Sequence, residues 1–275
     1  MQTQLRPVVA KPQVTSVSVR EPSAIATASL QLKQRYATFA QLAQDSKRNR
    51  IGAFVLAAFL VAVPVFIQAP LVRIAPWFSL LCTAGWLSLG YRWMNDTDPH
   101  RPNRALWGDL IVGFSWTWLA GSVYWGWFRE NPYIHLPIES IGLPIVLVLM
   151  LASRLTRRSE AGRFSVSDFG IGNFFYLGSL IGTAITDLYF YCVGLIPYWK
   201  AVMSAPEDAS TILHSALLRM STYEGVGYAI VLLALLVMLG TIPMRSRSTK
   251  WWAFSGAILS TILVDSLFFV AAICS

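Results

Sequence analysis

Blocks of about twenty apolar residues recur along this 275-residue chain, and they constrain its fold more than any other feature. A helix needs roughly that length to cross the hydrocarbon core of a bilayer. We therefore expect an all-α, polytopic membrane helix bundle with seven transmembrane helices. The expected spans are 51–69, 75–93, 106–128, 134–153, 168–197, 223–243 and 251–274.

Composition supports a membrane protein rather than a soluble basic one. Charged residues make up 13% of the chain, about half of their usual share in a soluble domain. The net charge of +8 comes from basic residues in the loops beside apolar segments, as is typical of membrane proteins. The expected partner is the lipid bilayer, and nucleic acid is excluded as an expected partner.

The distribution of Lys and Arg predicts the orientation. With the N-terminus in the cytoplasm, eighteen of the 22 basic residues fall on the cytoplasmic side of the seven segments. Basic residues concentrate in the cytoplasmic loops of membrane proteins, so we expect a cytoplasmic N-terminus and a non-cytoplasmic C-terminus. Four basic residues remain on the other side: Arg73, Arg129, Lys200 and Arg219.

The chain divides into a tail and a membrane domain. Residues 1–46 are expected to form a disordered, basic cytoplasmic tail, and residues 47–275 the seven-helix domain. A helical stripe near residues 30–43 predicts a short amphipathic helix at the end of the tail. The scarcity of acids also fits a plastid transit peptide, and that interpretation stays open. Residues 198–222 are expected to contain a further helix, starting near Pro206, on the non-cytoplasmic face.

Carboxylates inside apolar segments are the candidate functional groups, because a charge in hydrocarbon is costly and needs a reason. Asp265 is the deepest, roughly 20 Å along its helix, where a charge costs about 3 kcal/mol. We expect it to be protonated or partnered. Four acids fall in the outer half of the bilayer, and two residues of the hairpin tip accompany them. The candidate ion- or substrate-binding residues are Glu139, Asp187, Asp265, Glu224, His135 and Arg129.

Each acid also has a purely structural interpretation, and both interpretations stay open. Glu139 follows Pro137 in a first helical turn, where an acid is stabilised by the helix dipole. Glu224 is suited to the interface, and His135 is suited to a satisfied interfacial position. The other structural interpretations are an Asp187 bond to Tyr189 or Tyr191, and pairing of Asp109 with Arg104 or Arg92 at the cytoplasmic rim.

Motifs for metal, cofactor or catalytic chemistry are missing from the sequence. Cys82, Cys192 and Cys274 lie in apolar segments without CxxC spacing, so we interpret them as small buried hydrophobes. Phosphate loops, nucleophile elbows and HExxH are also absent from the sequence. We expect no metal and no cofactor, and catalytic residues stay unknown.

Two local resemblances bear on identity. The run from Ala62 to Arg73, with the hairpin tip NPYIHLP, resembles an uncharacterised integral-membrane family of cyanobacteria, a domain of unknown function. That resemblance covers about residues 50–275 and implies a plasma membrane or thylakoid membrane location and no activity. The segments Trp107–Asp109 and Leu136–Glu139 are similar to integral-membrane lycopene cyclases, in which such carboxylates protonate a polyene. Here the second acid of that motif is Ser140.

Three functions follow as hypotheses. The first is a small transport protein for an ion or solute, using Glu139, Asp187 and Asp265, with Asp265 as the coupling group. The second is a non-catalytic factor that scaffolds other membrane proteins or pigment, using the Gly178/Gly182 face and the tryptophans of residues 106–128. The third is a membrane enzyme acting on an isoprenoid or other lipid, with Glu139 as general acid.

Overall fold

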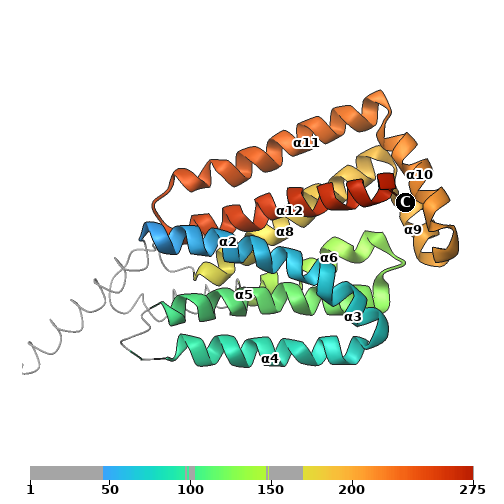
Figure 1. The fold of residues 1–275 in the computed structure, drawn as a ribbon. Helices are drawn as coiled ribbons and strands as arrows, with labels where there is room; N and C mark the ends of the chain where they lie inside the picture. Colours follow the sequence, from blue (N-terminus) through green and yellow to red (C-terminus); the bar gives the residue numbers. More distant parts are fainter. Residues whose placement is uncertain (1–45, 97, 99–102, 147, 149–169, 275) are drawn as a thin grey trace, which may run out of the picture. The chain divides into compact units, whose positions relative to one another are not determined.

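The computed structural model describes residues 46–96, 98, 103–146, 148 and 170–274, and their regular structure is entirely helical (Figure 1). The all-α class is therefore confirmed for the described part of the chain. The basic tail and its expected amphipathic helix lie outside the described residues.

The first two apolar segments are joined by a short turn but pack on different helices: α2 packs on α12, and α4 packs on α5. Helix α2 (Lys47–Val63) begins at Ser46, whose hydroxyl accepts a hydrogen bond from the Asn49 amide at 3.2 Å. At Pro64 the chain changes to a π-helical turn (Pro64–Gln68), because proline cannot supply the amide hydrogen bond of a regular α-helix. It continues as α3 (Ala69–Ile74) and returns as α4 (Pro76–Met94).

Helix α5 (Arg104–Val123) is enclosed by its neighbours, and most of its residues are buried. It packs on α4 and on α8 (Ile171–Val193), and Gly113 lies directly against the backbone of Gly172. A helix enclosed by protein needs no lipid-facing side, which explains why α5 tolerates many Trp, Ser, Thr and Gly residues. It continues as a π-helical turn (Tyr124–Phe128).

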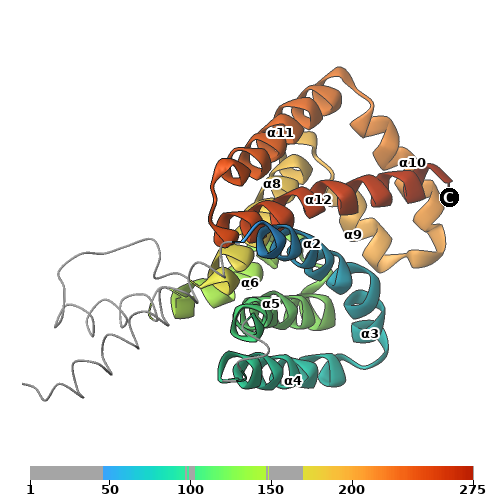
Figure 2. The same cartoon turned by 60° about the vertical axis from the view of Figure 1, so that its left-hand side comes forward.

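The second half of the described chain adds three long helices and two short ones. Helix α8 ends at Gly194, whose φ of 75° favours glycine, and the chain then bends by 100° into α9 (Ile196–Ser204). A 3₁₀ turn (Pro206–Asp208) and α10 (Ala209–Met220) follow, which confirms a helix within 198–222. Helix α11 (Tyr223–Thr241), a 3₁₀ turn (Pro243–Arg245) and α12 (Thr249–Cys274) complete the bundle. Figures 1 and 2 place α9 and α10 at one end of the long helices.

The segment 134–153 differs from the single helix expected there. The described part contains a 3₁₀ turn (Pro132–Ile134), a short helix α6 (His135–Glu139) and another 3₁₀ turn (Ser140–Gly142). Close packing explains the irregularity, because a Cβ at Gly142 would lie 3.1 Å from both Trp116 and Tyr176. Residues 149–153 lie outside the described residues.

Two described segments are long and apolar enough to cross a membrane. They are Lys47–Ile74 and Tyr223–Arg245, and α8 with α9 forms a third if the bent pair counts as one span. Helix α8 ends at Val193, so it is shorter than the expected span 168–197.

The small-residue face of α8 is used inside the chain. An added Cβ at Gly178 would lie 2.6 Å from the Phe254 carbonyl oxygen and 3.1 Å from the Ala257 methyl group. Gly182 lies in the same way against Thr261. Small residues let helix backbones approach closely, and here they seat α8 against α12.

Replacing Gly178 by Leu should destabilise the bundle by about 3 kcal/mol, because the new side chain would push α12 away. The matched control is Gly227→Leu on α11, where nothing lies within 4 Å of an added Cβ. We expect that control to change stability by less than about 0.5 kcal/mol. Thermal unfolding in detergent, followed by size-exclusion chromatography, measures both. Equal melting temperatures for the two variants would contradict the packing of α8 on α12.

Candidate functional site

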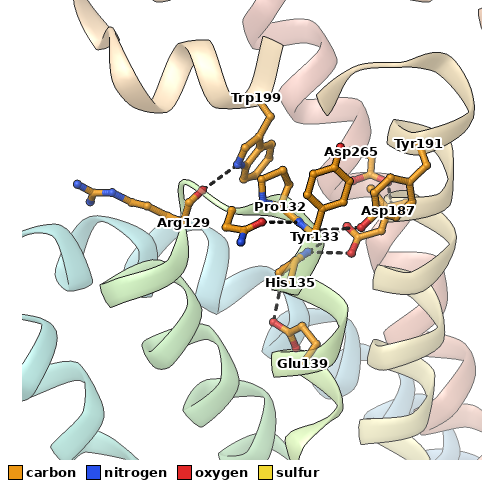
Figure 3. A network of polar contacts seen from close by, with 11 residues as sticks. Arg129, Pro132, Tyr133, His135, Glu139, Asp187, Tyr191, Trp199 and Asp265 are labelled. Atoms are coloured by element: carbon orange, nitrogen blue, oxygen red, sulfur yellow. Dashed lines mark hydrogen bonds and ion pairs between the residues drawn. The ribbon is translucent and has the colours of Figure 1, made fainter. Parts of the chain in front are cut away.

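A polar cluster forms where the hairpin after α5 meets α8. The hairpin turns at Asn131, whose side-chain oxygen accepts a hydrogen bond from the Tyr133 amide at 3.3 Å. Helix α6 then places His135 and Glu139 one turn apart, so both side chains lie on one face. Figure 3 shows this pair beside Asp187 of α8.

His135 lies between two carboxylates. Its Nδ1 is 3.0 Å and 3.1 Å from the two oxygens of Asp187, and its Nε2 is 3.8 Å from Glu139 Oε1. The three side chains are mostly buried, with 18%, 13% and 14% exposed for His135, Glu139 and Asp187. In the described part of the chain, no ion pair joins a Lys or Arg to either acid.

A third carboxylate lies next to this cluster. Thr186 Oγ1 donates a hydrogen bond of 2.9 Å to Asp265 Oδ2, which ties α8 to α12. Because Thr186 precedes Asp187, Asp265 of α12 contacts α8 one residue away from Asp187. The structure thus brings Glu139, Asp187 and Asp265 into one region, with His135 bound to the first two. Asp265, the acid that the sequence places deepest in the expected bilayer, is partnered by the Thr186 hydroxyl, as expected for a buried polar group.

Two tyrosines complete the surroundings of His135 and Glu139. The ring of Tyr124 lies 4.3 Å from the imidazole, centroid to centroid, and is fully buried. Its hydroxyl has no hydrogen-bond partner among the described residues. Tyr176 donates a hydrogen bond of 2.9 Å to the Glu139 carbonyl oxygen. Both side chains fix the position of α6 against α5 and α8.

The side of the cluster nearest to α9 is covered by aromatic residues. Trp199 of α9 donates its indole N–H to the Arg129 carbonyl oxygen at 2.9 Å. Tyr133 and Tyr191 stack with centroids 6.0 Å apart and an interplanar angle of 9°. The Arg129 side chain points away from the cluster in Figure 3, so its contribution is through the backbone.

Two other acids lie elsewhere. Glu224 is paired with Arg219 at 3.4 Å and its side chain is 72% exposed, in agreement with an interfacial position. Asp109 accepts a hydrogen bond of 3.2 Å from the Gly172 amide and caps α8, whereas Arg104 pairs with Asp96. The expected pairing of Asp109 with Arg104 is therefore wrong. Asp109 instead lies at the N-terminus of α8, where the helix dipole stabilises a carboxylate.

Asp109 and Glu139 are not brought together. Tyr124 contacts His135 and Trp116 contacts Gly142, so Glu139 lies beside a part of α5 about ten residues beyond Asp109. Ten helical residues correspond to roughly 15 Å. The two acids in the segments similar to lycopene cyclases therefore lie apart in the structure.

Metal-binding geometry is not found among the described residues, in which no group of three or more His, Cys, Asp or Glu could hold a metal ion. Cys82 and Cys192 are free, and Cys192 is exposed rather than buried as expected. Two cavities, of about 560 Å³ and about 390 Å³, are lined by other residues than the cluster.

The sequence matches the family described as Protein of unknown function (DUF3120) over residues 57–273. The chain belongs to this family. No curated protein and no solved structure matches it. The match covers all the described helices except the start of α2 and the last residue of α12, and it confirms the resemblance to a domain of unknown function. The cyanobacterial origin stays a prediction.

For this DUF3120 chain, sequence reasoning missed Tyr124 and Tyr176 as neighbours of the cluster. It also left the partner of Asp187 open between Tyr189 and Tyr191, and the structure gives His135 instead. Residue spacing carries no signal for the contacts of His135 with Asp187 and of Glu139 with Tyr176, because the partners are 52 and 37 residues apart. Trp118, one of the tryptophans of the expected span 106–128, packs on Trp86 and Phe114 in the core.

Proposed function

We propose that the chain is a seven-span membrane protein with a cytoplasmic N-terminus and a non-cytoplasmic C-terminus, located in the plasma membrane or the thylakoid membrane. The two apolar helices that suit a membrane support this, as does the length of α4, α5, α8 and α12, each 19 residues or more. The eighteen-to-four distribution of basic residues supports the orientation.

We further propose that it conducts or exchanges a small cation, in the simplest case a proton, through the cluster of His135, Asp187 and Glu139. The observation that carries this proposal is the imbalance of charge. One imidazole carries at most one positive charge, whereas the two carboxylates carry two negative charges when ionised. In a mostly buried site such an excess favours uptake of a proton or a small cation.

The position of the cluster suits exchange with the outer face. His135 follows the hairpin turn closely, and Asp187 lies six residues before the end of α8, roughly 9 Å along the helix. Asp265 extends the polar region to α12 through Thr186. Because Asp265 already has a hydroxyl partner, we assign the exchanging role to His135, Asp187 and Glu139 rather than to Asp265.

The other two hypotheses have less support. The scaffold hypothesis used the Gly178/Gly182 face, which packs on α12 within the chain, and the tryptophans of residues 106–128, of which Trp118 packs in the core. The enzyme hypothesis used Glu139 as general acid, and the two cavities are lined by other residues than Glu139. An apolar protein surface remains available for partners on the lipid-facing helices, but it favours no particular one.

Proton flux into liposomes tests the proposal. Purified protein is reconstituted with a pH-sensitive dye inside, and a potassium diffusion potential drives uptake. We expect flux above protein-free liposomes, and Glu139→Gln should lower it about tenfold, the equivalent of one charge-assisted interaction of about 1.4 kcal/mol. Sodium and potassium gradients in place of the proton gradient identify the ion.

The matched control is Glu224→Gln. Glu224 is an exposed acid on the same, non-cytoplasmic side of the proposed arrangement, and it is not part of the His135 cluster. It should leave flux unchanged. Equal flux in the wild type and Glu139→Gln, or a loss in both variants alike, would contradict a role for the cluster.

A further inference from the structure

A narrow apolar groove lies between α2 and α4, with α5 as its floor. Its volume of about 390 Å³ falls in the range of small-molecule sites. It lies on the opposite end of α5 from the His135 cluster, so it is a separate site. The lining residues are Leu56, Phe59, Leu60, Val63, Trp86, Trp93, Trp107, Ile111 and Phe114.

The groove has the form of a channel for a hydrocarbon chain. Its walls span residues 56–63, 86–93 and 107–114, which is eight residues on each helix. The seven helical steps between the first and the last of them correspond to roughly 10 Å. The groove is open toward the lipid side at Phe59, whose side chain is 60% exposed. A flexible acyl chain can enter from that side without any movement of a helix.

The cytoplasmic end of the groove is closed by tryptophan and bordered by arginine. The Trp107 ring lies 3.0 Å from an added Cβ at Gly52, so it fills the space between α5 and α2. The Arg104 guanidinium lies 5.6 Å from the centroid of the Trp93 ring. Arg104 is also paired with Asp96, which leaves its charge partly neutralised.

Arg48 supplies the exposed charge at this end. It is exposed and precedes Gly52 and Leu56 at spacings of four residues, so the three lie on one stripe of α2. The start of α2 is held against the start of α5 because Asn49 and Asn103 exchange two side-chain hydrogen bonds of 3.0 Å. Lys47, one residue earlier, is rotated about 100° around the helix from this stripe.

We propose that this groove binds an acyl chain of an anionic phospholipid, whose phosphate lies beside Arg48 and Arg104. The apolar lining selects a hydrocarbon chain, and the arginines at its cytoplasmic end select a negative headgroup. Basic residues at the cytoplasmic ends of membrane helices bind anionic headgroups in this way. A neutral lipid matches the groove but not its basic end.

Lipid retention measured by native mass spectrometry tests the site. The protein is purified in mild detergent and offered phosphatidylglycerol and phosphatidylcholine with identical acyl chains in equal amounts. We expect phosphatidylglycerol to be retained about fivefold over phosphatidylcholine, which corresponds to about 1 kcal/mol. Arg48→Gln should reduce this preference to near one, and Lys47→Gln should leave it unchanged.

A second pair of variants tests the acyl chain. Phe59→Ala removes an exposed wall of the groove without touching the core, so retention of both lipids should fall. Phe78→Ala, also exposed on α4 but outside the lining, should not change retention. Equal retention of the two lipids by the wild type would overturn the proposal. So would an equal effect of Lys47→Gln and Arg48→Gln, or a bound isoprenoid or pigment in place of phospholipid.

Discussion

Replacing Asp187 by Asn should lower cation flux by about 10- to 100-fold, the largest effect expected of any single acid. Asp187 makes the two short contacts to His135 Nδ1, at 3.0 and 3.1 Å. A hydrogen bond to a charged partner contributes about 1.5–3 kcal/mol, and each 1.4 kcal/mol is tenfold. Asn keeps the size of the side chain but removes its charge.

A double-mutant cycle with His135→Gln separates a shared function from two independent ones. If the imidazole and the carboxylate act as one unit, the double variant should lose little more flux than Asp187→Asn alone. Liposome flux measures the cycle, and circular dichroism confirms that each variant keeps its helices. Multiplicative losses in the double variant would contradict a common site.

Asp265→Asn is the matched control in this series. Asn retains an oxygen that accepts the hydrogen bond from Thr186, so the contact between α8 and α12 persists. We expect flux within about twofold of the wild type. A loss in Asp265→Asn, together with normal flux in Asp187→Asn, would transfer the coupling role to Asp265.

Cysteines introduced at positions 95 and 130 should react from opposite sides of the membrane. Asn95 and Glu130 are both exposed; Asn95 directly follows α4, and Glu130 lies two residues after the π-helical extension of α5. The 20 residues of α5 span about 30 Å, the thickness of the hydrocarbon core. Seven spans therefore place Glu130→Cys outside and Asn95→Cys in the cytoplasm.

Labelling of intact cells with a membrane-impermeant maleimide measures this. Cys82, Cys192 and Cys274 are first replaced by Ser, and this cysteine-free parent is the control for background. Glu130→Cys should react at once, and Asn95→Cys should react only after permeabilisation. Labelling of both positions from the same side would refute the seven-span arrangement.

Side-chain polarity was enough to locate most of the helices. The starts of α4, α5, α11 and α12 lie within two residues of the expected spans, because burial in hydrocarbon depends on the local sequence. Proline and glycine also acted locally: the π-helical turn begins at Pro64, and α8 ends at Gly194. The fourth segment was predicted less well, because packing of Gly142 against Trp116 and Tyr176 decides its conformation.

The sequence by itself determined the helical class, the approximate helix ends and the presence of acids in apolar segments. Only the tertiary structure decided which acids meet. His135 and Asp187 are 52 residues apart, and Thr186 and Asp265 are 79 residues apart. Such pairs depend on which faces of α6, α8 and α12 pack together. Contacts between helices are set by the shapes of all neighbouring side chains, whereas helix formation in most of the apolar segments follows from the local sequence.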